Sequence, residues 1–587
     1  MSKNEFKQPH HRTKIVATVG PACDTYDQLK NLVIAGVNVF RLNFSHGSHE
    51  DKKKIIDNIR GINEELGCTV AILGDLQGPK LRVGEIENNR LEVKEGDVLT
   101  FTNEKCVGTM EKIYVSYPNL AGDVVVNNLI MIDDGKIEVK VHSVEKNGDV
   151  KVKVTLGGII SSKKGINLPD TKISLPALTD KDLEDAAFII KEELDWVALS
   201  FVKRVADIEM LRDILNKNNC KSKIIAKIEM PEALTNIRDI IHASDAIMIA
   251  RGDLGVELPV EKIPLIQKEL IRKCLHRAKP VIVATQMMES MIDRVKPNRS
   301  EITDVANAVI EGADAVMLSG ETATGQFPVL VIETMRKIIH EVEQNGYKYN
   351  RADDFKPQSH SPSFLSDAVC YNGCKLADDS DAKAIIGMTQ SGYTAFMLSS
   401  FRPKSPLFIF TKEKSLVNQL SLSWGVRAFY YAEEAYMALD IIQKAGLPSV
   451  ITIAPMAENV MRDGVSIMDV CKELEQRGAD VVGMNCFRGP DTMMPYLREL
   501  RKILKCHMAA LPLPFRTTAA NPTFFNLPDD NGCSCPAPHG RTFPTALDPL
   551  YCNRYEIHAF AKESFELGIN YLGVCCGATP MHIREVA

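Results

Sequence analysis

Short apolar runs alternate with amphipathic segments over most of the first 346 residues. The runs lack polar alternation, which is typical of parallel strands that are buried on both faces. Helical periodicity fills the intervals, as in Thr25–Ala35, Glu50–Leu66 and Val260–Ala278. Strands that alternate with helices in this way predict a (β/α)8 or TIM barrel. The predicted strands are Lys14–Val19, Val37–Leu42, Thr69–Leu73, Trp196–Phe201, Lys223–Ile228, Ala246–Ala250, Pro280–Ala284 and Ala315–Leu318.

The third and fourth runs are separated by far more than one helix. Apolar and polar positions alternate between them, with Gly, Asn and Asp at the turns, which predicts short half-exposed strands. We therefore predict an all-β domain over residues 79–171, inserted into a barrel formed by residues 12–78 and 172–346. Its clearest strands are Arg90–Val93, Val98–Thr102, Lys136–Val141 and Asp149–Val154.

Strands and helices resume after a polar linker, Tyr347–Pro362. Residues 360–432 predict a smaller α/β domain, and residues 433–587 predict further β/α units that a long loop, Thr517–Thr545, interrupts. The predicted strands are Ala384–Met388, Leu407–Phe410 and Val426–Tyr431 in the first region, and Ser449–Ile453, Val481–Asn485, His507–Leu511 and Tyr571–Val574 in the second.

Composition and charge exclude several classes of protein. The chain is 45% hydrophobic and 25% charged, and its net charge of -6 gives no general attraction to nucleic acid or anionic membranes. No apolar run is long enough to span a bilayer, and the first residues lack the apolar core of a signal peptide. We therefore expect a cytoplasmic protein. The 15 cysteines concentrate after residue 470, and an odd count in the cytosol favours thiols or metal ligands over a disulfide framework.

Charged side chains stand where most of the predicted barrel strands end, which is where the active sites of such barrels lie. Both signs occur at several ends, which favours phosphoryl transfer, a reaction that depends on positioning and charge neutralisation. Glu229 and Asp253 offer hard oxygen ligands that suit Mg²⁺. The residues at or after strand ends are Arg41, Asn43, Ser45, Asp75, Lys80, Arg82, Lys227, Glu229, Arg251, Asp253, Thr285, Ser319 and Glu321.

Several segments of the barrel region resemble those of the pyruvate kinase family and occur in the family's order. They are KIVATVGP, VFRLNFSHG, GDLQGPKLR, SKKGINLP, AKIEMPEAL, IMIARGDLGVE, ATQMMESM and DAVMLSGETATG. The smaller α/β domain is similar to that family's C-terminal domain, so the resemblance spans about residues 12–432. It implies a homotetrameric enzyme of glycolysis that transfers the phosphoryl group of phosphoenolpyruvate to ADP, giving pyruvate and ATP.

The resemblance also implies roles for individual residues. Lys227 would stabilise the phosphoryl group in transfer and the enolate oxygen, and Glu229 and Asp253 would hold Mg²⁺ or Mn²⁺. The inserted domain would act as a lid that closes over the nucleotide and excludes water. Further implied sites are Arg41, Asn43, His46 and Gly252 for the substrate, Arg82 and Lys164 for ADP phosphates, Thr285 and Ser319 beside the enolate carbon, and Asn43, Ser45, Asp75 and the Leu76 carbonyl for a monovalent cation.

Lys80 departs from the family pattern. Many members need K⁺ and carry glutamate at this place in GDLQGPKLR. Because the ammonium group of Lys80 can supply the charge that K⁺ would bring, we predict activity without K⁺. The alternative is a solvated lysine without a role.

The smaller domain departs from the family as well. The family pattern stops near Tyr431, so we expect the domain of residues 360–432 to be truncated. Its loop Thr389–Thr394 resembles an effector-phosphate loop, with hydroxyls and a glycine before a helix N-terminus, but Tyr393 stands where a basic residue is common. A serine–glycine turn without a ligand is the alternative.

The residues after 433 carry a different signal. VVGMNC ends one predicted strand at Cys486, and YLGVCCG ends another at Cys575 and Cys576. Three thiolates at strand ends can bind Zn²⁺ and leave one position for a substrate thiol; buried structural thiols are the alternative. VITIAP, GADVVGMNCFRGP and FPTALDPLYCNRYEIHAFAKESFELGINYLGVCCGATPMHIR resemble the C-terminal half of a betaine–homocysteine S-methyltransferase, which implies Zn²⁺ at these three cysteines. Cys533 and Cys535 form a weaker C-x-C candidate.

That second resemblance covers only part of an eight-stranded barrel, and four strands cannot close one. We therefore expect no methyl transfer, and homocysteine binding only if an oligomer completes the half-barrel. The alternatives are a bifunctional enzyme, a zinc-dependent interaction module, and an artificial fusion with aggregation-prone strand edges. The segment Glu433–Pro455 fits both families, and we expect Ser449–Ile453 to pair in the sheet of the preceding domain.

Overall fold

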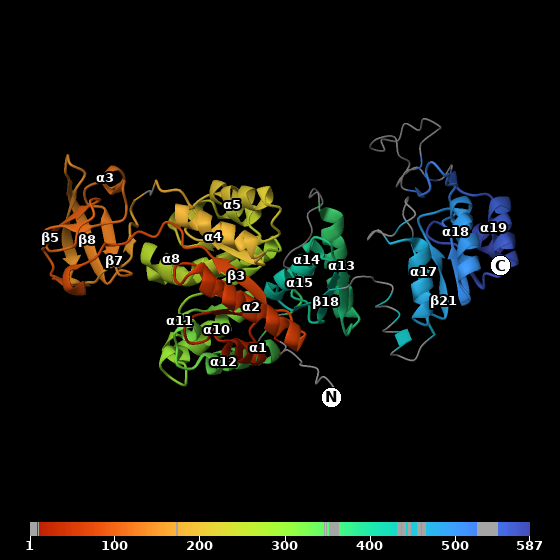
Figure 1. Ribbon diagram of the computed structural model, residues 1–587, viewed down its shortest axis with the longest axis horizontal. Helices are drawn as coiled ribbons and strands as arrows, with labels where there is room; N and C mark the ends of the chain where they lie inside the picture. The colour runs from red at the N-terminus through yellow and green to blue at the C-terminus, as the bar shows by residue number, and fades with distance from the viewer. Residues whose placement is uncertain are drawn as a thin grey trace. The chain divides into compact units, whose positions relative to one another are not determined.

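Eight parallel strands close into a barrel in the computed structural model of the chain, as the apolar runs predict. Figure 1 shows the course of the chain. The structure describes residues 11–171, 174–345, 349–351, 363–430, 448–454, 465–524 and 550–587, with isolated positions between these ranges. The strand order is β1-β16-β15-β14-β13-β12-β3-β2. The strands are β1 (Lys14–Thr18), β2 (Val39–Asn43), β3 (Ala71–Asp75), β12 (Trp196–Leu199), β13 (Lys223–Ile228), β14 (Ala246–Ala250), β15 (Val281–Ala284) and β16 (Ala315–Leu318).

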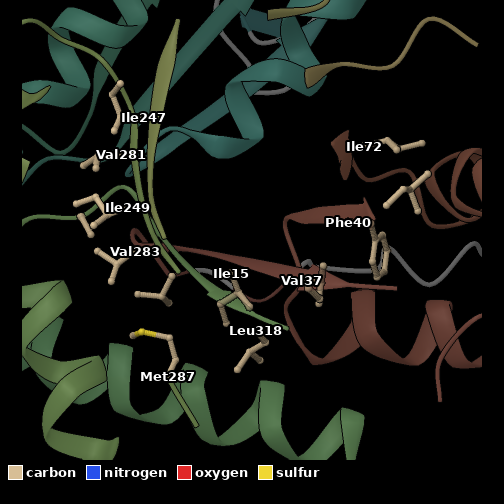
Figure 2. Packing of buried hydrophobic residues seen from close by; sticks show 14 of the residues in the cluster. Ile15, Val37, Phe40, Ile72, Ile247, Ile249, Val281, Val283, Met287 and Leu318 are labelled. Atoms are coloured by element: carbon tan, nitrogen blue, oxygen red, sulfur yellow. The ribbon is translucent and has the colours of Figure 1, made fainter. Parts of the chain in front are cut away.

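Each barrel strand buries both of its faces. Ile247 and Ile249 of β14 pack beside Val281 and Val283 of β15 in the layer between strands and helices (Figure 2). Met248, which lies between the two isoleucines, belongs instead to the cluster that fills the barrel interior. Successive side chains of a strand point to opposite faces, so burial on both faces explains the continuous apolar runs in the sequence.

Helices surround the barrel and begin where polar caps stand in the sequence. Thr25 and Ser48 each accept the backbone N–H three residues on, and that third residue bonds back to the cap, which fixes the starts of α1 and α2. The helices are α1 (Tyr26–Ala35), α2 (His49–Leu66), α4 (Asp180–Lys191), α5 (Val205–Lys217), α6 (Pro231–Thr235), α7 (Ile237–Ala243), α8 (Arg251–Glu257), α9 (Ile263–His276), α10 (Arg299–Glu311), α11 (Gly320–Ala323) and α12 (Pro328–Asn345).

The inserted region between β3 and β12 is a mainly antiparallel β-structure with its own hydrophobic cluster. Asn167 Nδ2 donates to Glu257 Oε1 of α8 at 2.8 Å and so joins the base of this region to the barrel. One sheet has the order β11-β7-β8-β9-β5-β6, and β4 pairs with β10. The elements are β4 (Leu91–Val93), β5 (Val98–Thr102), β6 (Ile113–Tyr114), α3 (Leu120–Asp123), β7 (Leu129–Ile132), β8 (Ile137–Val144), β9 (Val150–Leu156), β10 (Gly158–Ile160) and β11 (Ile166–Asn167).

The smaller domain closes the amino-terminal end of the barrel. Leu422 is fully buried within the cluster that fills the barrel interior. Nearby, the Trp196 indole N–H donates to the Gln419 carbonyl at 3.2 Å, and buried Arg402 pairs with Asp314 at 2.9 Å. The domain has the parallel sheet β17-β18-β19. Its elements are α13 (Phe364–Asp379), β17 (Ile385–Met388), α14 (Tyr393–Ser400), β18 (Leu407–Thr411), α15 (Lys414–Gln419) and β19 (Val426–Tyr430).

The chain divides into two units, Met1–Tyr430 and Tyr431–Ala587. In the second unit the parallel sheet β20-β21-β22-β23 packs with its helices around one apolar cluster, which confirms a partial second (β/α) barrel. Its described elements are β20 (Val450–Ile453), α17 (Ile467–Gln476), β21 (Val481–Asn485), α18 (Pro490–Ile503), β22 (His507–Leu511), α19 (Arg554–Glu566), β23 (Tyr571–Leu572) and α20 (Pro580–Val586).

The expected pairing of Ser449–Ile453 with the preceding domain is wrong. Val450 lies opposite Val481, so β20 belongs to the sheet of the second unit. The physical reason is that Ile451 and Ile453 are buried in the same apolar cluster as Leu439 and Val482, which commits the strand to the second unit.

Some predictions lie beyond what the structure describes. Most of the predicted linker Tyr347–Pro362 and much of the loop Thr517–Thr545, with Cys533 and Cys535, fall outside the described residues. The predicted domain limits stay predictions. Among the described helices, none has both the length and the apolar content needed to cross a bilayer.

Replacing Leu422 with alanine should destabilise the first unit by about 2–5 kcal/mol, because it removes buried carbon and leaves a cavity in the barrel interior. The measurement is the free energy of unfolding from urea denaturation. Leu265→Ala is the matched control, since Leu265 is 71% exposed on α9. Equal losses in the two variants would show that Leu422 does not complete the barrel core.

Candidate active site

The carboxyl ends of β2, β3, β12 and β13 enclose a cavity of about 160 Å³. These strands are neighbours in the barrel, so residues far apart in sequence meet there. Most of the residues predicted for the site line it, together with Leu76, Gln77, Ser200 and Phe201. The predicted residues at the cavity are Arg41, Asn43, Ser45, His46, Asp75, Lys80, Arg82, Lys227, Glu229 and Asp253.

Lys227 is the centre of a buried ionic cluster. Its Nζ lies 2.9 Å from Glu229 Oε1 and 3.4 Å from Asp75 Oδ1. The other oxygen of Asp75 accepts a hydrogen bond from Arg41 Nε at 2.6 Å. Burial alone would raise the pKa of Asp75, but the charges of Lys227 and Arg41 outweigh it and hold that pKa below its ordinary value. The cluster therefore keeps Asp75 ionised beside two cations.

Glu229 has the opposite electrostatic balance. Burial raises its pKa, and the negative charge of Asp253 adds to the rise against the attraction of Lys227. Both carboxylates line the cavity. The two carboxylates are hard oxygen donors, and their negative charges repel each other. A divalent cation such as Mg²⁺ bound between them would relieve this repulsion, so these residues fit the predicted metal.

Two strand ends place non-glycine residues in the left-handed backbone region. Phe201, after β12, has φ of 54°, and its N–H donates to Glu229 Oε2 at 2.7 Å. Thr285, after β15, has φ of 69°, and its hydroxyl oxygen accepts the Gly252 N–H at 2.8 Å. Arg251 Nη2 donates to the Thr285 carbonyl at 2.7 Å and supports this conformation. Strained backbone of this kind concentrates at functional sites.

Not every predicted residue reaches the cavity. In the part of the chain that the structure describes, Gly252, Thr285 and Ser319 are outside its lining. Lys164, on the inserted domain, also stands outside it and pairs with Asp133 at 2.9 Å. Arg82 does line the cavity, and its guanidinium donates to the Lys163 carbonyl at 3.0 Å.

The proposed monovalent-cation residues and Lys80 share the cavity. Lys80 Nζ lies 3.6 Å from Asp253 Oδ1. Asn43 Oδ1 accepts the Ser45 N–H at 3.0 Å, and the Leu76 carbonyl accepts the Ser200 hydroxyl at 2.8 Å. Lys80 therefore lines the same cavity as the residues expected to hold a cation, with its ammonium group paired to Asp253.

Ser200 and Phe201, like Gln77, line the cavity but were missed by the charge pattern. Ser200 and Phe201 directly follow the fourth barrel strand, and both are uncharged, so a search for charged strand ends passes over them. A serine directly after the apolar run Trp196–Leu199 was the available signal.

Two lysines support the loop after β2, which carries Ser45 and His46. Lys181 Nζ donates to the Phe44 carbonyl at 2.7 Å and to Asp185 Oδ2 at 2.6 Å. Lys52 donates to the carbonyl of His46. Both lysines thus fix backbone carbonyls of a loop whose side chains face the cavity.

The proposed effector loop is closed on itself. The Gly392 N–H donates to Thr389 Oγ1 at 3.0 Å, and the Tyr393 hydroxyl donates to Asp367. An acidic partner for Tyr393, where a basic residue is common, does not favour an anion here.

The predicted zinc cysteines come together in the second unit. The Sγ atoms of Cys486, Cys575 and Cys576 all lie within 4.8 Å of one another. Two of the three, Cys486 and Cys575, are joined by a disulfide. Cys576 stays a free, exposed thiol with its Sγ 3.7 Å from that of Cys575. The three sulfurs are a soft donor set, which after reduction fits Zn²⁺.

Comparison with protein families gives three matches. The model "Pyruvate kinase, barrel domain" matches residues 10–332, and "Pyruvate kinase, alpha/beta domain" matches residues 367–468. "Homocysteine S-methyltransferase" matches residues 424–587. The last two overlap, so residues 424–468 satisfy both patterns.

Curated relatives and a solved structure agree with the first two matches. A pyruvate kinase of Geobacillus stearothermophilus is 44% identical over 427 residues, which are 72% of this chain and 72% of that protein. One of Corynebacterium efficiens is 41% identical over 456 residues, 76% of this chain and 94% of that protein. The crystal structure of a pyruvate kinase from Cryptosporidium parvum superposes with a TM-score of 0.71 at 36% identity, covering 76% of this chain and 93% of that one.

Lys181→Met should raise the KM for the phosphoryl donor by about tenfold, because it frees the Phe44 carbonyl and lets the cavity loop move. Steady-state kinetics with varied donor concentration measures the effect. Lys273→Met is the control, since Lys273 pairs with Glu269 within α9 and lies outside the cavity lining. A KM in Lys181→Met equal to that of the control would contradict a supporting role.

Proposed function

The chain belongs to the pyruvate kinase family, and we propose that Lys227 and the charges around it carry its phosphoryl transfer from phosphoenolpyruvate to ADP. The observation that supports this most is the buried Lys227 ammonium, held between Asp75 and Glu229 at the wall of the cavity. A fixed positive charge in a site that excludes water stabilises negative charge far better than the same charge in solvent.

Each residue of the cluster has a distinct role in the proposal. Lys227 and Arg41 neutralise the phosphoryl oxygens, and Lys227 also stabilises the enolate oxygen left on the donor. Asp75 orients both cations because its two oxygens contact one each. Glu229 and Asp253 would hold Mg²⁺ or Mn²⁺, which when bound supplies further positive charge to the donor's carboxylate and phosphate.

Nucleotide binding and proton delivery involve residues at the edge of the cavity. We assign Arg82 and Lys164 to the ADP phosphates, with the inserted domain as the lid that carries Lys164. The enolate carbon must gain a proton to become pyruvate. We assign its delivery to the path of Thr285 and Ser319, with the Thr285 hydroxyl oriented by the Gly252 N–H. The family resemblance further supports a cytoplasmic homotetramer.

Lys80 should make the enzyme independent of K⁺, because it brings a positive charge to the cavity that Asn43 and Ser45 also line. Pyruvate formation from phosphoenolpyruvate and ADP is measured with Mg²⁺ in a Tris or Na⁺ buffer, with and without K⁺. We expect little activation of the unmodified chain, and activation of about tenfold for Lys80→Glu, equal to about 1.4 kcal/mol of barrier.

The charge-reversal control is Lys146→Glu, on an exposed turn between β8 and β9 of the lid. Strong activation of the unmodified chain by K⁺ would contradict the role of Lys80. A folded chain that forms no pyruvate in any of these buffers would contradict the assignment of the cavity as the active site.

We further propose that the second unit binds Zn²⁺ and transfers no methyl group. The soft donor set of Cys486, Cys575 and Cys576 supports metal binding. The described strands of this unit form a sheet of four, and a barrel wall that holds a second substrate needs more. A zinc-dependent interaction module is therefore the favoured role among the alternatives.

Reduction of the Cys486–Cys575 disulfide with a phosphine should allow one Zn²⁺ to bind per chain, and Cys486→Ser should abolish this binding. Metal analysis after dialysis measures it. Cys506→Ser is the control, since Cys506 lies in the same unit outside the cluster. Equal zinc in the Cys486→Ser and Cys506→Ser proteins would refute the site, and methyl transfer to homocysteine would refute the inactive assignment.

A further inference from the structure

Ser200, at the carboxyl end of β12, connects the catalytic lysine to the backbone of the neighbouring strand. Lys227 Nζ donates to Ser200 Oγ at 2.7 Å, the shortest of its three contacts. Ser200 Oγ in turn donates to the Leu76 carbonyl at 2.8 Å. The Ser200 side chain is buried and lines the cavity.

The chemistry of a hydroxyl makes this connection directional. A serine hydroxyl has one proton, and here it donates that proton in a hydrogen bond to the Leu76 carbonyl. The lone pairs of the hydroxyl oxygen therefore remain to accept a hydrogen bond from the ammonium group. The Leu76 carbonyl is a fixed reference because the Leu76 N–H donates to the Ala198 carbonyl at 3.0 Å. The orientation of the hydroxyl is therefore set by the Leu76 backbone just after β3, which is itself bonded to β12.

Lys227 has partners of two kinds. It forms ion pairs with Glu229 Oε1 and Asp75 Oδ1, and it donates a hydrogen bond to Ser200 Oγ. Two of these acceptors are anionic and the third is neutral. A third carboxylate would cancel more of the positive charge that a phosphoryl group needs, whereas a hydroxyl fixes the position and leaves that charge available.

Close packing holds Ser200 in place. A Cβ atom on Gly78, whose φ is +68°, would come within 3.0 Å of Ser200 Cβ and 2.9 Å of the Phe201 ring. The glycine lets the loop after β3 approach the end of β12 closely. The residue after Ser200, Phe201, donates its backbone N–H to Glu229. The end of β12 therefore contacts both Lys227 and Glu229.

We propose that Ser200 is a positioning residue for Lys227, holding the ammonium group where the phosphoryl group and the enolate oxygen develop charge. The inference rests on the proposed role of Lys227. Because it acts on the transition state, loss of the hydroxyl should lower kcat and leave the KM for phosphoenolpyruvate nearly unchanged.

Ser200→Ala should lower kcat by about tenfold to a hundredfold and change KM by less than about threefold. Ser200→Thr keeps the hydroxyl and should retain most of kcat, whereas Ser200→Cys keeps the shape but offers a poor acceptor and should behave as Ser200→Ala. Ser244→Ala is the matched control, since Ser244 is equally buried and its hydroxyl donates to the Ile240 carbonyl at 2.8 Å. It should lose stability without losing kcat.

Unchanged kcat in a folded Ser200→Ala protein, or a loss confined to KM, would overturn the proposal. If Ser200→Ala does not fold, Ser200→Thr and Ser200→Cys decide, and equal kcat in these two would overturn it. Lys227→Met distinguishes a failure of the proposed role of Lys227 from a failure of the proposed role of Ser200. An active Lys227→Met protein would refute the role of Lys227 itself, while an inactive one beside a fully active Ser200→Ala would refute only the role of Ser200.

Discussion

The first unit depends on keeping a lysine ammonium charged in a place that water barely reaches. Removing a charge from water costs several kcal/mol unless other groups replace the solvent, and here Asp75, Glu229 and Ser200 replace it around Lys227. These acceptors come from three different barrel strands. A closed parallel barrel brings such strand ends to one rim at fixed spacing. The fold therefore supplies the groups that stabilise the buried charge, and that charge is then available to the substrate.

The barrel and most of its charged site could be predicted from the sequence because two strong signals coincide. Continuous apolar runs indicated buried parallel strands, and charges such as Glu229 stood where those runs end. Ser200 and Phe201 could not be found in this way. Ser200 contributes a hydroxyl of fixed orientation, and Phe201 contributes a backbone N–H that a left-handed conformation directs. Neither property appears in composition or periodicity. Tertiary contacts between β3 and β12 create both.

The junction shows the opposite limit, where the sequence is informative but ambiguous. Two family models match residues 424–468, and the local pattern of a helix followed by a strand satisfies either. Periodicity specifies the element and not its neighbour. The choice is made by burial, because Leu439, Ile451 and Ile453 join the apolar cluster that α17 and α18 also build. The presence of a strand at this place was therefore predictable from the sequence. The sheet in which it pairs could be decided only by comparing the two hydrophobic cores in three dimensions.

Leu422, which is buried in the barrel interior, comes late in the chain, and this order has a consequence for synthesis on the ribosome. The last barrel strand, β16, is complete before the residue that fills the barrel's amino-terminal end has been made. About a hundred residues separate the two, which at roughly 5 to 20 residues per second is a delay of about 5 to 20 s. During that interval the nascent barrel has an open, apolar interior at one end. Chaperone engagement is thus expected to matter most in this window, and the smaller domain serves as the final step of barrel folding before it serves any other purpose.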